Sequence, residues 1–435
     1  MLDTSENKAR ALLGYVSRLP LIAYLRDPLH GNAIFLIATS AANALIGFFF
    51  WTLAARLYPV EAVGQATAMV SAGNLLVILS GLGMSIGVIR FLGESRNKVM
   101  LINSAFTVVA AAALFLAIVF LIGLDIWSPA LDFVQQSPWL IAAFICYCLF
   151  QTMGTLQNNI FAAFRKSYYA FFQSLIVAVK ILLLVLLLGL GLVGIFSSFT
   201  LGVILAFLAA NFFLRRLHSG YRLQPALERN ILKAIFKFTS GNYVGDVLKA
   251  LTGVIMPLVV INLLGAEQNA YFYIAWMIAS LYFTVAYSVN LSLVAEATHQ
   301  PENLYHQVSK VLKFAFMILV PAIVLIYFLG GFLLSFFGEQ YANEGLWLLR
   351  LLTISSIPVT VNETYIAIFR IRKQVLPIML IYGLISLATI LGGYLLLGVL
   401  GLNGIGVAWL ASHVLTMIVV ILLNWRHMVH RVKHV

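Results

Sequence analysis

Long apolar stretches alternate with short polar segments along nearly the whole chain. A helix needs roughly 20 predominantly apolar residues to cross about 30 Å of hydrocarbon, and the stretches are long enough. The pattern predicts twelve membrane-spanning helices at residues 32–57, 64–91, 99–123, 138–161, 168–189, 192–217, 234–264, 268–295, 308–333, 345–369, 375–399 and 401–425. Six of the predicted spans fall in each half of the chain.

The first half of the sequence is repeated in the second half. Three segments carry the repeat: residues 44–66 with 250–272, residues 164–165 with 369–370, and residues 190–195 with 400–405. An even number of spans in each half predicts a parallel repeat, whose axis lies along the membrane normal. We therefore predict an all-α, polytopic membrane protein with twelve transmembrane helices in two six-helix lobes, related by a pseudo-twofold axis along the membrane normal.

The predicted organisation has five parts. They are a cytoplasmic amphipathic N-terminal segment at 1–31, an N-lobe at 32–217, a polar and basic cytoplasmic linker at 218–233, a C-lobe at 234–425 and a basic cytoplasmic tail at 426–435. Two interpretations of residues 1–31 stay open, a helix lying on the inner membrane surface or an irregular leader. We expect no cleavable signal peptide, because the first span is too long for the apolar region of one.

The charges give the predicted orientation. The chain is 62% apolar and 10% charged, with a formal net charge of +12. Basic residues gather in alternate loops, as at Arg96, Arg165, Arg216 and Lys373, whereas the intervening loops carry acids. Because Lys and Arg in short loops resist translocation, both termini are predicted to be cytoplasmic, in a multi-pass protein of the cell membrane. The positive charge also attracts anionic lipid heads, and it requires no nucleic acid as a partner.

Charged residues inside the predicted spans are the candidates for function, because each is costly in hydrocarbon. Lys180 lies near the middle of the fifth span, and Asn242, Asp246 and Lys249 share one face of the seventh. The repeat maps Lys249 onto Asn43 of the first span, so we predict that both faces line an aqueous cavity. Two alternatives stay open: Asp246 and Lys249 form a purely structural ion pair, or Lys180 extends to the membrane surface.

The carboxylates suggest coupling and gating. Glu363 lies deep in the tenth span without a basic neighbour on its helix, and burial favours the neutral form of a carboxyl group. Asp246 and Glu363 are therefore the candidates for coupling to a proton or a sodium ion, unless each is permanently paired. Arg90 and Glu296 occupy equivalent ends of the second and eighth spans and are predicted to form an inner gate, or else are two independent surface charges. We predict no metal site, no catalytic residue and no cofactor.

Three segments resemble a known family. Residues 51–90, 236–276 and 338–373 are similar to polysaccharide transporter proteins, the oligosaccharide (O-antigen) flippases of the multidrug/oligosaccharidyl-lipid/polysaccharide exporter superfamily. The resemblance implies that an oligosaccharide linked to polyprenyl phosphate or pyrophosphate moves from the cytoplasmic to the outer leaflet by alternating access, for cell-surface polysaccharide synthesis. It also implies a glycan polymerase or glycosyltransferases as partners. It brings no fixed motif, so the candidate site residues rest on their positions in the spans.

An anionic head group needs cationic partners to enter the membrane, because its charge forfeits hydration there. The candidate substrate-binding residues are Arg90 near the inner mouth, Lys180, Lys249, Asn43 and Asn242 at mid-depth, and Arg56 and Arg350 near the outer mouth. Aromatic residues such as Trp276 are candidates for stacking on sugar rings.

Two other functions are weighed against the flippase. A multidrug or organic-cation antiporter of the same superfamily should favour acidic and aromatic cavity residues, and the lysines at mid-depth argue against it. A membrane glycan polymerase or another enzyme needs a large outer loop or a cytoplasmic nucleotide-sugar domain, and the chain has neither. We therefore predict a membrane transporter rather than an enzyme.

Overall fold

The computed structural model describes residues 28–218, 220–299 and 304–432. Within these residues every regular element is a helix, which confirms the predicted all-α class. The N-terminal half contains α3 (Pro28–Leu57), α4 (Val60–Ser80), α5 (Met84–Phe91), α6 (Lys98–Ile122), α7 (Leu124–Trp127), η1 (Pro129–Val134), α8 (Pro138–Ala163), α9 (Tyr168–Val177), α10 (Val179–Leu186), η2 (Leu188–Leu190) and α11 (Gly191–Leu217). The C-terminal half contains α12 (Arg229–Leu264), α13 (Ala266–His299), α14 (Leu304–Ser335), α15 (Glu339–Ile354), α16 (Ser356–Ile371), α17 (Val375–Leu400) and α18 (Leu402–Val432).

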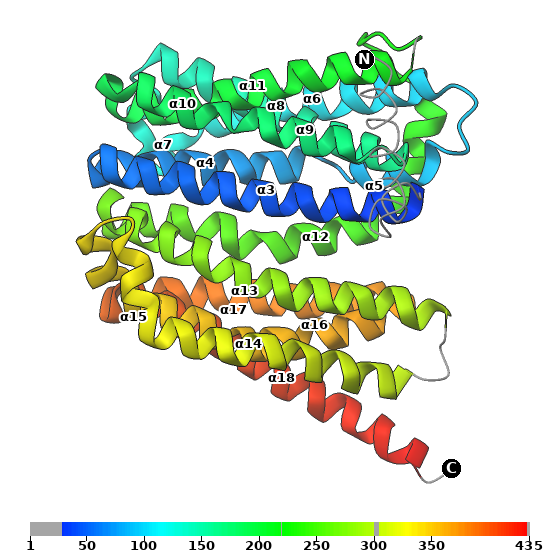
Figure 1. Cartoon of the computed structure of the whole chain (residues 1–435), viewed down its shortest axis with the longest axis vertical. Coiled ribbons are helices and arrows are strands. Elements are labelled where there is room, and N and C mark those ends of the chain that lie inside the picture. Colours follow the sequence, from blue (N-terminus) through cyan, green and yellow to red (C-terminus); the bar gives the residue numbers. More distant parts are fainter. Residues whose placement is uncertain (1–27, 219, 300–303, 433–435) are drawn as a thin grey trace, which may run out of the picture.

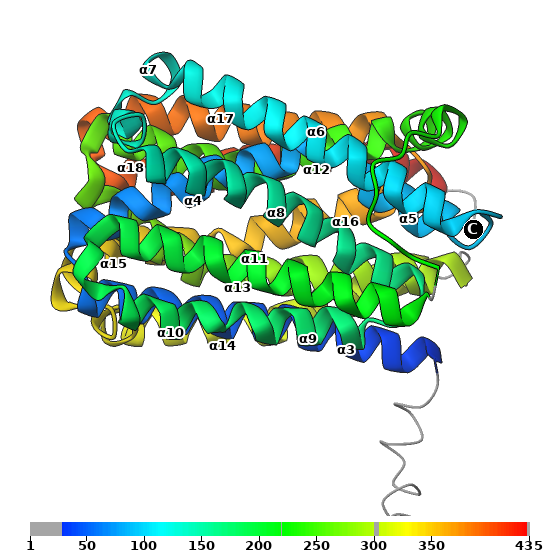
Figure 2. The same cartoon turned by 90° about the horizontal axis from the view of Figure 1, so that it is seen from above.

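Among the described residues, twelve helical stretches are long and apolar enough to cross a membrane, which confirms the predicted number. They form two lobes, with α3 to α11 in the N lobe and α12 to α18 in the C lobe (Figure 1). Figure 2, seen from above, looks through one lobe onto the other. The helices run side by side along the same direction, as a bilayer requires, because hydrocarbon offers no partners to backbone polar groups. The predicted N-terminal amphipathic segment lies outside the described residues, except that α3 already begins at Pro28.

Buried aromatic side chains form the core, and apolar side chains cover the outside. The largest fully buried side chains include Phe50, Tyr147 and Phe196 in the N lobe and Phe272, Phe337 and Tyr341 in the C lobe. Exposed large apolar side chains include Phe115, Ile122, Leu186, Phe328, Leu395 and Val399. A multi-pass membrane protein with lipid around these faces accounts for this exposure, which would be a liability in water.

Three predicted spans are interrupted. The second is divided into α4 and α5 by Leu82 and Gly83, whose φ values of 48° and 72° cannot continue a right-handed helix. The tenth is divided into α15 and α16 just before Pro358, which has no N–H to donate to the carbonyl one turn earlier. The fifth is divided into α9 and α10 at Ala178, two residues before Lys180.

The turns of the two halves match closely. Arg165 ends the fourth span of the N lobe with φ of 56°, and Lys373 ends the fourth span of the C lobe with φ of 57°. Gly191 is the first residue of α11 and Gly401 directly precedes α18, the last span of each lobe, and both glycines have φ of 55°. The sequence match of Arg165 with Arg370 is therefore wrong by three residues, because a helix end fixes the register and a shared dipeptide does not.

Close helix contacts also recur between the halves. A Cβ at Gly194 would lie 2.2 Å from the carbonyl oxygen of Leu187, and a Cβ at Gly404 would lie 2.5 Å from that of Leu396. Both glycines let the last helix of a lobe begin against the end of the preceding helix. This explains why the segment that begins at Leu190 is repeated at Leu400.

The two ends of the molecule differ in charge. We call the end that carries Glu61, Asp125, Glu267 and Glu339 the acidic end, and the end that carries Arg90, Arg165, Arg216 and Lys373 the basic end. Helix α12 begins at Arg229, five residues earlier than the span predicted there, which shortens the linker at the basic end.

The lobes meet tightly at the acidic end. A Cβ at Gly64 of α4 would lie 1.7 Å from the carbonyl oxygen of Ala266, so only glycine fits against the start of α13. The side-chain amide of Asn269 donates to the carbonyl of Gly64 at 2.8 Å and to the hydroxyl of Thr67 at 3.1 Å. Arg56 of α3 donates to the backbone carbonyls of Ser335 and Phe336 at the end of α14. These contacts join the lobes at the acidic end.

Candidate functional site

Each lobe contains a cavity of its own. The N-lobe cavity has a volume of about 310 Å³ and lies among α3, α8, α9, α10 and α11. Its polar lining consists of Asn43, Gln151, Thr155, Asn158, Gln173, Ser174 and Lys180. A lysine among hydroxyls and carboxamides, with no carboxylate in the lining, gives this cavity a positive charge.

Lys180 is held inside the N lobe by aromatic rings. Lys180 is 5% exposed, and its ammonium lies 3.8 Å from the ring centre of Phe199 and 4.9 Å from that of Phe50. The break between α9 and α10 brings its backbone against Gly202 of α11, where a Cβ would lie 2.9 Å from the Cβ of Lys180. Cation–π contacts compensate part of the lost hydration, and they leave the charge without a counter-ion.

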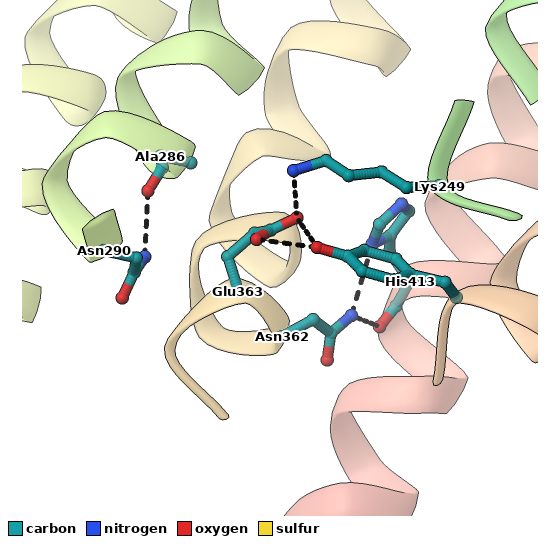
Figure 3. A network of polar contacts seen from close by, with 7 residues as sticks. Lys249, Ala286, Asn290, Asn362, Glu363 and His413 are labelled. Atoms are coloured by element: carbon teal, nitrogen blue, oxygen red, sulfur yellow. Dashed lines mark hydrogen bonds and ion pairs between the residues drawn. The ribbon is translucent and has the colours of Figure 1, made fainter. Parts of the chain in front are cut away.

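The C-lobe cavity is larger, about 460 Å³, and it contains an ion pair. The ammonium of Lys249 on α12 lies 3.2 Å from Oε1 of Glu363 on α16 (Figure 3). The hydroxyl of Tyr382 on α17 donates to both carboxylate oxygens of Glu363 at 3.1 Å. Three helices therefore meet at one carboxylate, and the acid that pairs with Lys249 is Glu363 rather than Asp246 on its own helix.

Aromatic rings also surround Lys249. Its ammonium lies 3.6 Å from the ring centre of Tyr287 on α13, and the guanidinium of Arg370 lies 6.0 Å from the same ring. Asp246 lines the same cavity and is exposed. The cavity lining thus carries two carboxylates and one ammonium, which is the opposite charge balance to that of the N-lobe cavity.

A second polar cluster lies beside the ion pair. The side-chain amide of Asn362 on α16 lies 3.2 Å from Nδ1 of His413 and donates to the backbone carbonyl of His413 at 3.0 Å (Figure 3). Since a carbonyl only accepts, the nitrogen of Asn362 is fixed there, and Nδ1 of His413 must accept as well. His413 is therefore the neutral tautomer that carries its proton on Nε2.

The two cavities occupy equivalent places in the repeat. The sequence repeat pairs Asn43 with Lys249, and the register of the turns pairs Thr155 with Glu363 and Phe199 with Trp409. The same three positions line both cavities, so the lobes share an architecture and differ in chemistry. Lys180 has no lysine counterpart in the C lobe.

The structure brings the predicted site residues together only in part. Lys180 and Asn43 share the N-lobe cavity, and Asp246, Lys249 and Glu363 share the C-lobe cavity. The other candidates lie outside both linings: Asn242 and Arg56 are exposed, and Arg350 donates to the carbonyl of Tyr327 at 2.8 Å. The predicted single ladder of cations is thus divided between two cavities and the lobe surfaces.

The candidates for the inner gate lie at the basic end. Arg90 forms an ion pair with Glu94, four residues further along the chain, and both side chains are about half exposed or more, at 49% and 64%. Glu296 is exposed on α13. The gate between Arg90 and Glu296 stays a prediction.

Sequence reasoning missed several lining residues. Tyr287, Tyr382 and His413 come from three different helices, and nothing in the sequence indicates that they converge on Lys249 and Glu363. His413 carried one signal, since an ionisable residue inside a predicted span is a candidate by itself. In the part of the chain that the structure describes, His, Cys, Asp and Glu side chains form no cluster of three or more suited to a metal ion.

Comparison with known proteins finds the same fold among solved structures. No family model matches the sequence, and a search of curated proteins finds no match. Among solved structures, an inward-facing multidrug resistance MATE family transporter of the MOP superfamily matches with a TM-score of 0.69 and 17% identity over 90% of this chain and 96% of that one. The lipid II flippase MurJ, in an inward closed conformation, matches with a TM-score of 0.71 and 16% identity over 90% of this chain and 87% of that one.

The chain has the fold of these transporters. An outward-facing MATE family transporter of the same superfamily also matches, with a TM-score of 0.65 and 18% identity over 94% of this chain and 98% of that one. The matches extend over nearly the whole chain, and they confirm the predicted twelve-helix fold. Within this shared fold, the neighbours include both a drug transporter and a lipid-linked substrate flippase.

Proposed function

We propose that this protein is a flippase that moves a lipid-linked oligosaccharide, carried on polyprenyl phosphate or pyrophosphate, from the cytoplasmic to the outer leaflet by alternating access. The observation that carries the proposal is Lys180, a buried ammonium in a cavity whose lining contains no carboxylate. The lipid II flippase MurJ shows that this fold accommodates a lipid-linked substrate.

The energetic argument starts from the cost of the buried charge. An ammonium inside a membrane protein is costly unless it is paired or hydrated. The cation–π contacts with Phe50 and Phe199 offset only part of that cost. A phosphate or pyrophosphate entering the N-lobe cavity supplies the missing counter-charge, and Lys180 in turn supplies part of the hydration that the anion gives up. The side-chain amide of Asn43, which also lines this cavity, adds a neutral hydrogen-bond donor.

The contacts between the lobes at the acidic end bear on alternating access. The contacts of Gly64, Asn269 and Arg56 join the lobes there, and they are the contacts that must separate for a substrate to leave on that side. We propose that the basic end is cytoplasmic, so that the protein lies in the cell membrane with both termini inside. Glycosyltransferases would then supply the lipid-linked glycan, and a glycan polymerase would consume it.

Ion coupling forms a further part of the proposal. Asp246 and Glu363 are the proposed coupling carboxylates for a proton or a sodium ion, and both line the C-lobe cavity. Glu363 already has Lys249 and Tyr382 as partners, so it becomes free only when that pair opens. Lys249 can therefore serve as a second anion partner only in a state in which Glu363 has released it.

The test uses purified protein in proteoliposomes that contain a polyprenyl pyrophosphate carrying a fluorescent oligosaccharide. Dithionite added outside bleaches only outward-facing label, so the bleaching trace gives the flipping rate. Lys180→Met should reduce the rate at least about 10-fold, because the anion loses its buried cation. Lys180→Arg should retain a substantial part of the rate, and Lys310→Met, at an exposed lysine near the start of α14, serves as the control. Normal flipping by Lys180→Met would refute the proposal.

A second candidate is an organic-cation antiporter. The C-lobe cavity favours it, because Asp246 and Glu363 lie there together with Trp276 and Trp409, and aromatic faces bind cations. The same proteoliposomes loaded with tetraphenylphosphonium decide between the two functions. Flux of this cation driven by a pH or sodium gradient, abolished by Asp246→Asn and unaffected by Lys180→Met, would select the antiporter.

A further inference from the structure

Two neighbouring hydrogen-bond donors in the C-lobe cavity have no acceptor. Nε1 of Trp409 and Nε2 of His413 are buried atoms without a hydrogen-bond partner among the described residues. The two residues are 9% and 5% exposed, and both line the cavity. Their ring centres are 4.3 Å apart, so the two side chains are neighbours in the cavity wall. A buried N–H without an acceptor is unfavourable, which makes such a pair in a cavity wall a sign of a missing oxygen ligand.

The protonation of His413 is fixed by its neighbours. Nδ1 accepts from the amide of Asn362, whose nitrogen is oriented by the carbonyl of His413. Nε2 therefore carries the proton, and it lies on the side of the ring away from Asn362 (Figure 3). Trp409 Nε1 can only donate. Both free groups thus require an acceptor, and neither can bind a second donor.

Aromatic rings border the same place. Trp409 packs against Trp276 with ring centres 5.0 Å apart and against Phe283 at 5.3 Å. All three residues line the cavity. A flat apolar wall with hydrogen-bond donors beside it suits a pyranose ring, which has a C–H face and hydroxyl or carbonyl oxygens at its edge.

The charge of the cavity argues against an anion at this place. Its lining contains the carboxylates of Asp246 and Glu363, and Lys249 is already paired with Glu363. The guanidinium of Arg370, 6.0 Å from the ring centre of Tyr287, adds a second cation beside these carboxylates, so the charges here are already balanced. A further negative group would find no free cation, whereas a neutral oxygen can accept from the N–H groups of Trp409 and His413. The N-lobe cavity differs, with Lys180 and no acid in its lining.

We propose that Trp409 and His413, with Trp276 beside them, form a binding subsite for a neutral sugar ring of the lipid-linked glycan, separate from the phosphate site at Lys180. This inference rests on the proposed function and deepens it by dividing the substrate between the two lobes. The N lobe binds the charged linkage, and the C lobe binds the sugar. The lobes differ here because Phe199, the counterpart of Trp409, has no N–H to offer.

Two probes that differ only in the sugar test the inference. Geranyl pyrophosphate and geranyl-pyrophosphoryl-N-acetylglucosamine are titrated into the purified full-length protein in nanodiscs, and each Kd is measured by calorimetry. The ratio of the two Kd values is the sugar increment, which should be about 10 or more in the unaltered protein. Trp409→Phe keeps an aromatic ring and removes the N–H, and it should lower the increment about 3- to 10-fold. The Kd of the sugar-free probe should stay within about twofold.

A second variant and a control complete the experiment. His413→Asn keeps an acceptor for Asn362 and removes the Nε2 donor, and it should lower the increment to a similar extent. Trp139→Phe is the matched control, because Nε1 of Trp139 already donates to Ser197 at 2.9 Å in the N lobe, so the increment should not change.

The outcomes separate the two proposals. Lys180→Met should weaken both probes by the same factor and leave the sugar increment intact. No sugar increment in the unaltered protein, or an unchanged increment in both Trp409→Phe and His413→Asn, would overturn the sugar subsite while the pyrophosphate site stands. Failure of geranyl pyrophosphate to bind, or binding insensitive to Lys180→Met, would instead overturn the proposed function.

Discussion

The ion pair between Lys249 and Glu363 predicts an unequal response to the loss of either partner. At the observed 3.2 Å, the Coulomb attraction is about 5 kcal/mol for an effective dielectric constant of about 20. Desolvation of both groups offsets part of this energy, because the side chains of Lys249 and Glu363 are 32% and 10% exposed. We expect a net coupling of roughly 2 to 3 kcal/mol between the two residues.

The asymmetry follows from what each substitution leaves behind. Lys249→Met leaves a nearly buried carboxylate whose remaining hydrogen-bond partner is Tyr382, and we expect a loss of about 3 kcal/mol of stability. Glu363→Gln leaves an ammonium that is a third exposed and lies over the ring of Tyr287, and we expect a loss of about 1 to 2 kcal/mol. The double variant Lys249→Met with Glu363→Gln should lose about 2 to 3 kcal/mol less than the sum of the two single variants, since no unpaired charge remains.

The assay is equilibrium unfolding of the purified protein in mixed micelles, followed by circular dichroism as the fraction of SDS increases. The four proteins form a double-mutant cycle, and the same cycle on the exposed pair of Arg90 and Glu94 serves as the control, with an expected coupling within about 0.5 kcal/mol. Additive effects of the two substitutions at Lys249 and Glu363, within about 0.5 kcal/mol, would show that the pair contributes nothing and would refute the reasoning.

Two glycines give further predictions. Gly64→Leu should push α4 away from the carbonyl of Ala266 and separate the lobes at the acidic end. The distance between spin labels at the acidic ends of α4 and α13, measured by double electron–electron resonance, should therefore lengthen. An unchanged distance distribution would contradict this prediction. Gly404→Ala should destabilise the protein by about 1 to 3 kcal/mol, because the added methyl group meets the carbonyl of Leu396. Gly398→Ala, where the added methyl group meets open space on the preceding helix, should be neutral or stabilising by up to about 1 kcal/mol. Equal unfolding midpoints for the two variants would contradict this contrast.

Most of the fold follows from the sequence, and the reason is local. A membrane span is a long apolar run whose backbone groups pair within the run, so its existence depends on neighbouring residues alone. The breaks in the spans were less visible. Pro358 indicates one of them. Leu82 adopts a left-handed backbone conformation, which a leucine in the sequence does not predict. The repeat was detected, although one of its three matched segments was three residues out of register.

The sequence predicts only part of the candidate site. Lys180, Lys249 and Glu363 could be identified as candidates because each lies far inside a predicted span, where an ionised side chain is costly. Their partners were not visible, because the helical period relates only residues on one helix. Asp246 was the partner that the period offered to Lys249, and Glu363 is the one that the structure provides.

The sequence by itself determined that this chain is a duplicated bundle of twelve membrane-spanning helices with basic loops at one end, because hydropathy and charge act residue by residue. Only the tertiary structure decided which helices adjoin. That packing divides the predicted single crevice into a positive N-lobe cavity around Lys180 and an aromatic, acidic C-lobe cavity around Glu363 and His413. The physical reason is that the free energy of a charge or an N–H in the membrane depends on the groups within a few ångströms of it, and those groups come from helices far apart in the chain.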